Sequence, residues 1–232
     1  MFLGVSGCFL LVFFLLGLAV DSVVDRLPTD FETNATFTPL ISGNKINQEL
    51  QSKVNELLSC AGIQNAIHVS VVDDSSINAM ALPGKHMVVN QGLLDAVKSD
   101  IGLSFVLAHE LAHFQHKDHL RGLGRGIVLS GLSAMLTGSS SSLTQLLTPA
   151  SHAGQSHYSK GRERLADTAA LKTVSCFYGH TEGATELFHV IVERSEESRW
   201  SNLNHYLSSH PDTDERIHVI NALSRELKDA NE

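Results

Sequence analysis

The chain has 232 residues, of which 43% are hydrophobic and 18% are charged, with a mean hydropathy of +0.02. This composition is typical of one globular domain of moderate size and excludes disordered, collagen-like and repeat proteins. The 25 acidic and 17 basic residues give a net charge of -8, the wrong sign for binding a phosphate backbone, so nucleic acid is not an expected partner. Thirteen histidines are a high number and a first indication of metal chemistry.

Residues 1–20 are predicted to be a signal peptide or a signal anchor. From Phe2 to Val20 the sequence has no charged residue and is almost wholly apolar. Gly17 and Ala19 supply the small residues of a cleavage site, so cleavage after Ala19 is one interpretation and a retained membrane anchor the other. Both predict an exported protein that is periplasmic or anchored with its remaining residues outside the cytoplasm. Membrane association is expected through this segment.

Two cysteines follow the leader, Cys60 and Cys176, far apart in the sequence. Export makes a disulfide between them chemically possible. Two buried free thiols are an equally good interpretation.

Residues 21–42 are polar, lack periodicity and contain prolines, which predicts a polar tether before a single domain over residues 43–232. The first predicted helix ends near Gly62 and has an apolar stripe at three- and four-residue intervals, formed by Ile46, Leu50, Val54 and Leu57. Alternating apolar residues over 67–71 predict a strand. Residues 78–82 and 86–89 flank Pro83-Gly84 and are expected to form a hairpin. With the strand predicted over 67–71, this hairpin gives a small early sheet.

After Gly92 the sequence predicts helices, at 101–116, 122–136, 159–176, 181–196 and 212–230. Ser99 and Thr181 are expected to cap the helices that follow them. The apolar segment 122–136 is short for a membrane span, which favours a buried or interfacial helix. The predicted fold class is α+β, mainly helical, with a small early sheet.

His109, Glu110 and His113 form the motif H-E-x-x-H within a predicted helix. One helical turn separates the two histidines, so both imidazoles project from one face and can bind a single tetrahedral zinc ion. Glu110 points about 100° away from His109, so it misses the metal but reaches a water bound there. It is the expected general base and later proton donor to the leaving amine.

A catalytic zinc needs a third protein ligand and an open fourth position. Glu163 and Asp167 lie one turn apart on the helix predicted at 159–176. We expect Glu163 to be the third ligand and Asp167 to accept a hydrogen bond from the free ring nitrogen of a ligand histidine. Taken alone, this helix better fits an exposed face on which both acids balance Arg162 and Arg164. Together with the first motif it predicts one Zn²⁺ per chain.

The chain resembles the HtpX and CAAX-prenyl-protease family of HExxH zinc metallopeptidases, in particular its compact exported bacterial members. The resemblance is carried by His109, Glu110 and His113 and by three further segments: the N-A, P-G and G-L-L elements over 78–94, the S-R-x-x-E-x-x-A-D-like run Tyr158–Asp167, and His210-Pro211 with Arg216-Ile217. It implies a zincin-like fold, zinc-dependent endopeptidase activity and Glu163 as third ligand. Damaged or misfolded cell-envelope proteins are the substrates it implies.

The resemblance also implies a role for His210, either as a hydrogen-bond donor to the oxyanion or as an occupant of the open zinc position in a resting state. A structural cap of the last helix is the alternative. Three residues depart from the family pattern. Lys160 replaces an arginine that could orient a carboxylate with a bidentate fork, Met80 replaces a phenylalanine, and Lys85 interrupts a Pro-Gly-Gly turn.

The predicted function is therefore zinc-dependent cleavage of protein substrates, with residues 86–89 holding an extended chain by β-augmentation. The alternative is a non-hydrolytic, zinc-stabilised chaperone or adaptor module, in which His210 closes the site as a fourth ligand. A histidine-rich metal buffer that holds several ions is a weaker possibility.

Other polar residues near the motifs are expected to have no catalytic role. His116 and His119 are predicted to face solvent, and His152 and His157 to flank the cleft. Asp118 is expected to form an ordinary surface ion pair with Arg121 or Arg125. The segment 122–142 is interpreted as a cover or membrane-facing element.

Overall fold

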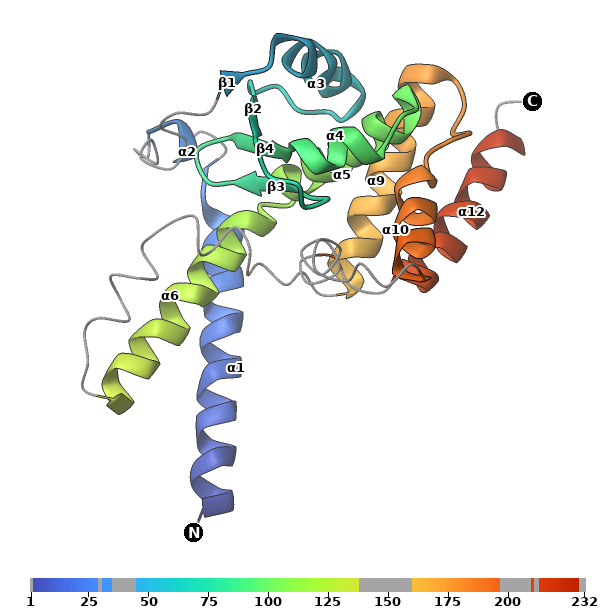
Figure 1. The fold of residues 1–232 in the computed structure, drawn as a ribbon. Coiled ribbons are helices and arrows are strands. Elements are labelled where there is room, and N and C mark those ends of the chain that lie inside the picture. Colours follow the sequence, from blue (N-terminus) through green and yellow to red (C-terminus); the bar gives the residue numbers. More distant parts are fainter. Residues whose placement is uncertain are drawn as a thin grey trace.

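A computed structural model describes residues 2–28, 31–34, 45–137, 160–196, 210 and 213–229 (Figure 1). The described chain is mainly helical with one early sheet, as the sequence predicts. The helices are α1 (Phe2–Arg26), α2 (Phe31–Asn34), α3 (Gln48–Cys60), α4 (Gln91–Ala96), α5 (Asp100–Gln115), α6 (Asp118–Thr137), α9 (Lys160–Tyr178), α10 (Glu186–Glu196) and α12 (Thr213–Asp229). The strands are β1 (Lys45–Ile46), β2 (His68–Val72), β3 (Ala79–Leu82) and β4 (His86–Asn90).

The sheet has the strand order β1-β2-β4-β3. Strand β4 pairs in parallel with β2 and antiparallel with β3, so its backbone groups are used on both sides. The prediction that residues 86–89 hold a substrate by β-augmentation is therefore wrong, because augmentation needs a free strand edge. Within the described sheet, the edge beside β4 is β3.

Helix α5 runs through the centre of the domain, with the sheet on one side and α9 on the other (Figure 1). Its side chains are buried around the whole circumference over most of its length, which explains why its sequence is almost uniformly apolar. One apolar core joins α5 to the sheet and α3, and a second joins it to α9, α10 and α12. Ser99 caps its first turn by accepting a hydrogen bond from the backbone N–H of Gly102 at 3.0 Å, as expected.

Helix α10 begins at Glu186, not after Thr181, so the predicted cap is wrong. Gly183 has a φ of +100° and packs against Ile101, and this left-handed backbone cannot be part of an α-helix. Glu186, the first residue of α10, is held in place by a contact with another helix. Its carboxylate accepts hydrogen bonds from the backbone N–H groups of Lys98 and Ser99 at the start of α5.

The predicted tether over 21–42 is partly structured. Residues 21–26 continue α1, and Lys117 Nζ donates to the backbone carbonyls of Val24 and Leu27 at 3.3 and 2.6 Å. Glu32 in α2 is buried and accepts hydrogen bonds from the backbone N–H of Gly84 and from His119. His119 therefore faces inward, which corrects its predicted exposure. Residues 35–42 lie outside the described part of the chain.

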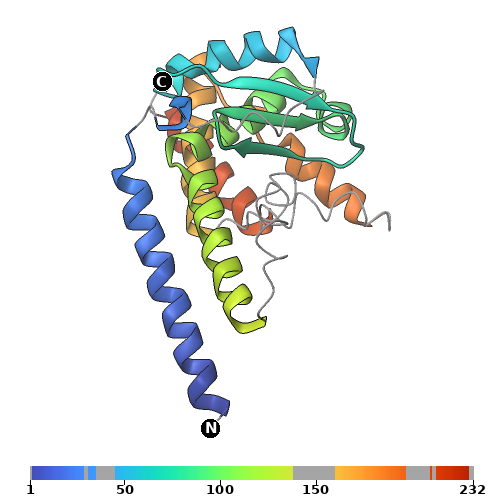
Figure 2. The ribbon, with the colours of Figure 1, turned by 90° about the vertical axis from the view of Figure 1, so that its left-hand side faces the viewer.

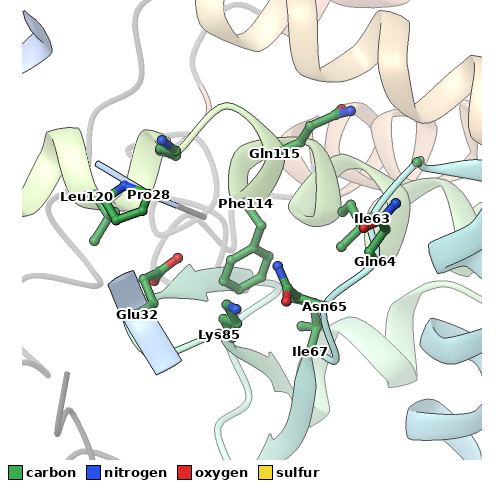
Figure 3. Close-up of a pocket in the computed structure, with 12 residues that line it drawn as sticks. Pro28, Glu32, Ile63, Gln64, Asn65, Ile67, Lys85, Phe114, Gln115 and Leu120 are labelled. Carbon is green, nitrogen blue, oxygen red and sulfur yellow. The ribbon is translucent and has the colours of Figure 1, made fainter. Parts of the chain in front are cut away.

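A cavity of about 250 Å³ lies between this N-terminal segment and the domain (Figure 3). Glu32 and Leu120 line one side, and Phe114 and Lys85 lie between them and the loop around Ile63. None of the H-E-x-x-H side chains lines it. Among the described residues, no helix has the length and hydropathy needed to cross a bilayer.

Cys60 and Cys176 form a disulfide, which decides between the two interpretations of the sequence. The bond joins the end of α3 to α9, across Cα atoms 5.8 Å apart and 116 residues of chain. In the chain-entropy model, closing a loop of this length stabilises the fold by about 4–5 kcal/mol. It also holds α9, the helix that carries Glu163, against α3.

Lys85→Gly is expected to raise the free energy of unfolding by about 1 kcal/mol and the melting temperature by roughly 2–4 °C. Lys85 has a φ of +60°, is buried, and its ammonium has no hydrogen-bond partner among the described residues. Glycine removes both the strain and a buried ammonium that has no hydrogen-bond acceptor among the described residues, and this gain is expected to exceed the loss of its attraction to Glu32.

Lys117→Gly is the matched control in the thermal unfolding experiment. Lys117 has a similar φ of +55°, but its ammonium bonds two carbonyls, so its replacement should not stabilise. Equal stabilisation by both variants would show that the buried charge of Lys85 is unimportant.

Candidate active site

His109 and His113 point to the same side of α5, and their Nε2 atoms lie 3.0 Å apart. Both side chains are buried, with exposed fractions of 1% and 0%. The spacing of four residues places them one turn apart, and the packing of α9 against this face of α5 excludes solvent. The structure thus brings together the two histidines that the motif predicts.

Glu163 reaches the same point from the first turn of α9. Its Oε2 lies 3.5 Å from His109 Nε2 and its Oε1 lies 3.5 Å from His113 Nε2. Small buried residues on this face, Ala166 and Ala170, allow α9 to approach α5 closely.

His210 completes a group of four buried donors. Its Nδ1 lies 3.4 Å from His109 Nε2 and 3.1 Å from Glu163 Oε2. All four donor atoms of His109, His113, Glu163 and His210 lie within 4.8 Å of one another. The sequence alone did not decide between a cap and a site residue for His210, and the structure places it at the site.

The donor set fits zinc. Ligands bound tetrahedrally at 2.0–2.1 Å are about 3.3 Å from one another. The separations of 3.0–3.5 Å among His109, His113 and Glu163, and from His210 to His109 and Glu163, are close to that value. Imidazole nitrogen combined with one carboxylate is a ligand set that zinc prefers.

Glu110 lies beside this cluster and not in it. It is fully buried, and no hydrogen-bond donor among the described residues satisfies either of its carboxylate oxygens. Its nearest charged neighbour in the site is His210, whose Nε2 lies 3.6 Å from Glu110 Oε1. A buried carboxylate without a donor is costly, so this position requires an additional partner such as water.

The comparison with protein families gives one match, to peptidase family M48 over residues 44–224. The match covers most of the chain and includes every residue of the buried cluster. The chain belongs to peptidase family M48. It is therefore a metallopeptidase of the HtpX type, as the sequence motifs imply. The comparison with curated proteins found no match.

In this M48 peptidase, Asp167 contacts the first histidine of the H-E-x-x-H motif. Its Oδ1 lies 2.9 Å from His109 Nδ1, one turn along α9 from Glu163. A partner on this nitrogen fixes the tautomer in which Nε2 is free to bind a metal.

Arg216 of α12 holds both acids in place, a contact that the sequence did not predict. It donates to the two oxygens of Asp167 at 2.7 Å each, and its Nη1 lies 2.9 Å from Glu163 Oε2. The guanidinium is buried among these groups, with an exposed fraction of 4%. The R-I element marked this residue, but its role depends on how α12 packs.

The charges around the cluster favour a cation. Burial lowers the pKa of the His109 imidazole, but the carboxylates of Asp167 and Glu163 outweigh this effect and raise it to about 9. Burial raises the pKa of Glu163, but His210, His109 and His113 together lower it well below its ordinary value. A proton and a metal ion compete for the same site, so metal affinity is expected to fall as the pH decreases.

Asp118 is a further site residue that the sequence interpretation missed. It was expected to pair with Arg121 or Arg125 at the surface, and Arg121 Nε does lie 3.8 Å from its Oδ1. Asp118 is buried, however, and its Oδ2 lies 3.0 Å from His113 Nδ1. Arg162 Nε lies 2.7 Å from its other oxygen. The two histidines of the H-E-x-x-H motif thus have equivalent carboxylate partners, Asp167 from α9 and Asp118 from α6. His152 and His157 lie outside the described residues.

Asp118→Asn is expected to raise the dissociation constant for zinc about 10- to 100-fold, because an amide no longer fixes the charge and tautomer of His113. The measurement is zinc affinity by competition with a fluorescent chelator. Asp95→Asn is the control, since Asp95 is exposed on α4. An unchanged affinity in the Asp118 variant would show that this carboxylate does not support the metal site.

Proposed function

We propose that this M48 peptidase is an endopeptidase that binds one zinc ion per chain through His109, His113 and Glu163. The observation that carries the proposal is the buried cluster of donors beside a carboxylate, Glu110, that accepts no hydrogen bond from the described residues. Hydrolysis of a peptide bond by a metallopeptidase requires a bound cation and a nearby group that takes the proton of water. The donor cluster and Glu110 supply these two elements in one place.

Zinc bound in this cluster supplies Lewis acidity, which polarises the scissile carbonyl and makes water acidic enough to lose a proton near neutral pH. Glu110 accepts this proton on a carboxylate oxygen as the water attacks the carbonyl carbon. It then donates the proton to the amine nitrogen that leaves. Asp167 and Asp118 keep the histidine rings oriented, and Arg216 keeps Asp167 and Glu163 charged.

His210 is the residue that distinguishes two kinds of zinc site. A site closed by four protein ligands is typical of structural zinc, and this favours the non-hydrolytic alternative, whereas a catalytic site keeps one position open. We propose that His210 withdraws when substrate binds. His210→Ala should then retain zinc, because three ligands remain, and loss of the metal would support the structural alternative.

The substrate is proposed to lie along β3, the edge strand that packs against α5 (Figure 1). An extended peptide would pair with the free side of this strand and cross the catalytic helix. Met80, which is partly exposed at the middle of β3, would border the bound chain.

The protein is further proposed to be exported and to degrade misfolded envelope proteins, with membrane association through the N-terminal segment. The disulfide between Cys60 and Cys176 supports export, because such bonds persist in oxidising compartments. In whole cells, the two cysteines should resist alkylation until a reductant is added. Alkylation without a reductant would argue against export.

The test of the peptidase function combines metal analysis with proteolysis. Purified protein should contain zinc at one ion per chain and cleave unfolded casein faster than a folded protein. Removal of zinc by 1,10-phenanthroline should stop cleavage, and added zinc should restore it. Cleavage that survives complete removal of the metal would overturn the proposal.

A further inference from the structure

Helices α1 and α6 lie side by side and project together from the domain, away from the sheet (Figure 1 and Figure 2). They pack closely where they leave the domain. A Cβ at Gly124 would lie only 2.6 Å from Val20 Cγ1, so a larger residue there would require the Val20 side chain or the helices to shift. The pair is therefore a specific two-helix unit.

A group of ion pairs joins the two helices near the domain. Arg125 donates to both carboxylate oxygens of Asp21 at 2.9 and 2.8 Å, and Arg121 pairs with Asp25. Beyond this group, in the direction of the tip, neither helix has a charged residue in its sequence, from Phe2 to Val20 in α1 and from Gly126 to Thr137 in α6. The charge boundary lies at the same level on both helices.

The surface beyond the ion pairs is apolar and open. Large side chains are exposed on both helices, including Phe14 at 62% and Ile127 at 46%. A groove of about 450 Å³ runs between the helices and is lined by apolar residues, among them Leu16, Leu123 and Val128. Soluble proteins rarely expose a continuous apolar surface of this kind without a partner.

We propose that α1 and α6 dock together into a phospholipid bilayer, with the ion pairs of Asp21 and Arg125 at the interface. A sharp change from paired charges to an uncharged surface, at one level on two helices, matches the boundary between headgroups and acyl chains. The uncharged part of α6 has 12 residues and is about 18 Å long, compared with a hydrocarbon core of about 30 Å. It therefore enters one leaflet and does not cross the membrane.

This proposal extends the N-terminal membrane association proposed above by adding α6, which begins at the active site. Asp118 starts α6 and bonds the metal-binding His113, and Arg125 lies seven residues further along the same helix, about 10 Å away along its axis. Docking would hold the catalytic cluster close to the membrane surface. The substrates that it reaches there are extended segments of membrane-bound or membrane-associated proteins.

The test places an environment-sensitive fluorophore on single cysteines of the full chain, in a Cys8→Ser background with the disulfide intact. The labelled variants are Ile127→Cys on α6, Phe14→Cys on α1 and, as a control, Glu226→Cys on the exposed face of α12. Each protein is reconstituted with vesicles of phosphatidylcholine and phosphatidylglycerol, with and without doxyl-labelled lipid as quencher.

Emission from positions 127 and 14 should shift to the blue and lose most of its intensity with the doxyl lipid, whereas position 226 should change little. Quenching at 14 with a response at 127 like that at 226 would overturn docking by α6 and leave an N-terminal anchor. A blue shift at 127 without quenching would mean that a second copy of the chain covers α6, which also overturns the proposal. Peptidase assays of the same samples report on catalysis separately.

Discussion

Glu110→Gln is expected to lower kcat for peptide hydrolysis by about 10²- to 10⁴-fold while zinc content and fold remain unchanged. The carboxamide has nearly the same shape as the carboxylate but cannot accept a proton from water at neutral pH. Glu110 lies outside the group of four donors that could hold a metal ion, so its replacement should leave the zinc in place. The measurements are kcat on unfolded casein, metal content and circular dichroism.

Glu193→Gln is the matched control for this experiment, because Glu193 is exposed on α10 and has no contact with the cluster. It should cleave casein at the rate of the unmodified protein. A Glu110 variant that keeps both its zinc and its full activity would exclude Glu110 as the general base. Equal inactivity of the unmodified protein and both variants would favour the non-hydrolytic alternative.

Arg216→Met is expected to lower the free energy of unfolding by about 3–5 kcal/mol and to weaken zinc binding. Methionine fills a similar volume but leaves Asp167 and Glu163 buried without their cation. Arg216→Lys should recover only part of the loss, because an ammonium cannot bond both oxygens of Asp167 as the planar guanidinium does. Urea unfolding with and without zinc measures both effects.

Arg164→Met is the control, because it removes an arginine from α9, the helix that packs against α12. Arg164 pairs with Glu215, but both side chains are about half exposed, at 56% and 49%. A pair of this kind contributes about 0–1 kcal/mol, so its loss should be small. Similar destabilisation by the two variants would contradict the role assigned to Arg216.

The parts of the site that the sequence predicted depend on local geometry. The spacing of His109 and His113, and that of Glu163 and Asp167, determines which side chains share a helix face, because the period of the α-helix is constant. The cap at Ser99 and the strands of the sheet follow from equally local preferences. Local spacing on each of the two helices was therefore sufficient to predict which side chains share a face, and the structure brings those of His109, His113 and Glu163 together.

The sequence by itself thus predicted the helical fold class, most of the helices after Gly92 and the family, while the tertiary structure decided which helices and strands meet. Asp118 and Arg216 gained their roles from packing between α5, α6, α9 and α12, and β3 became the edge strand through the pairing of β4 with β2. The partner of Cys60 was likewise set by the approach of α3 to α9. These contacts join residues far apart in the chain, and no local period or propensity specifies which distant groups will be buried together.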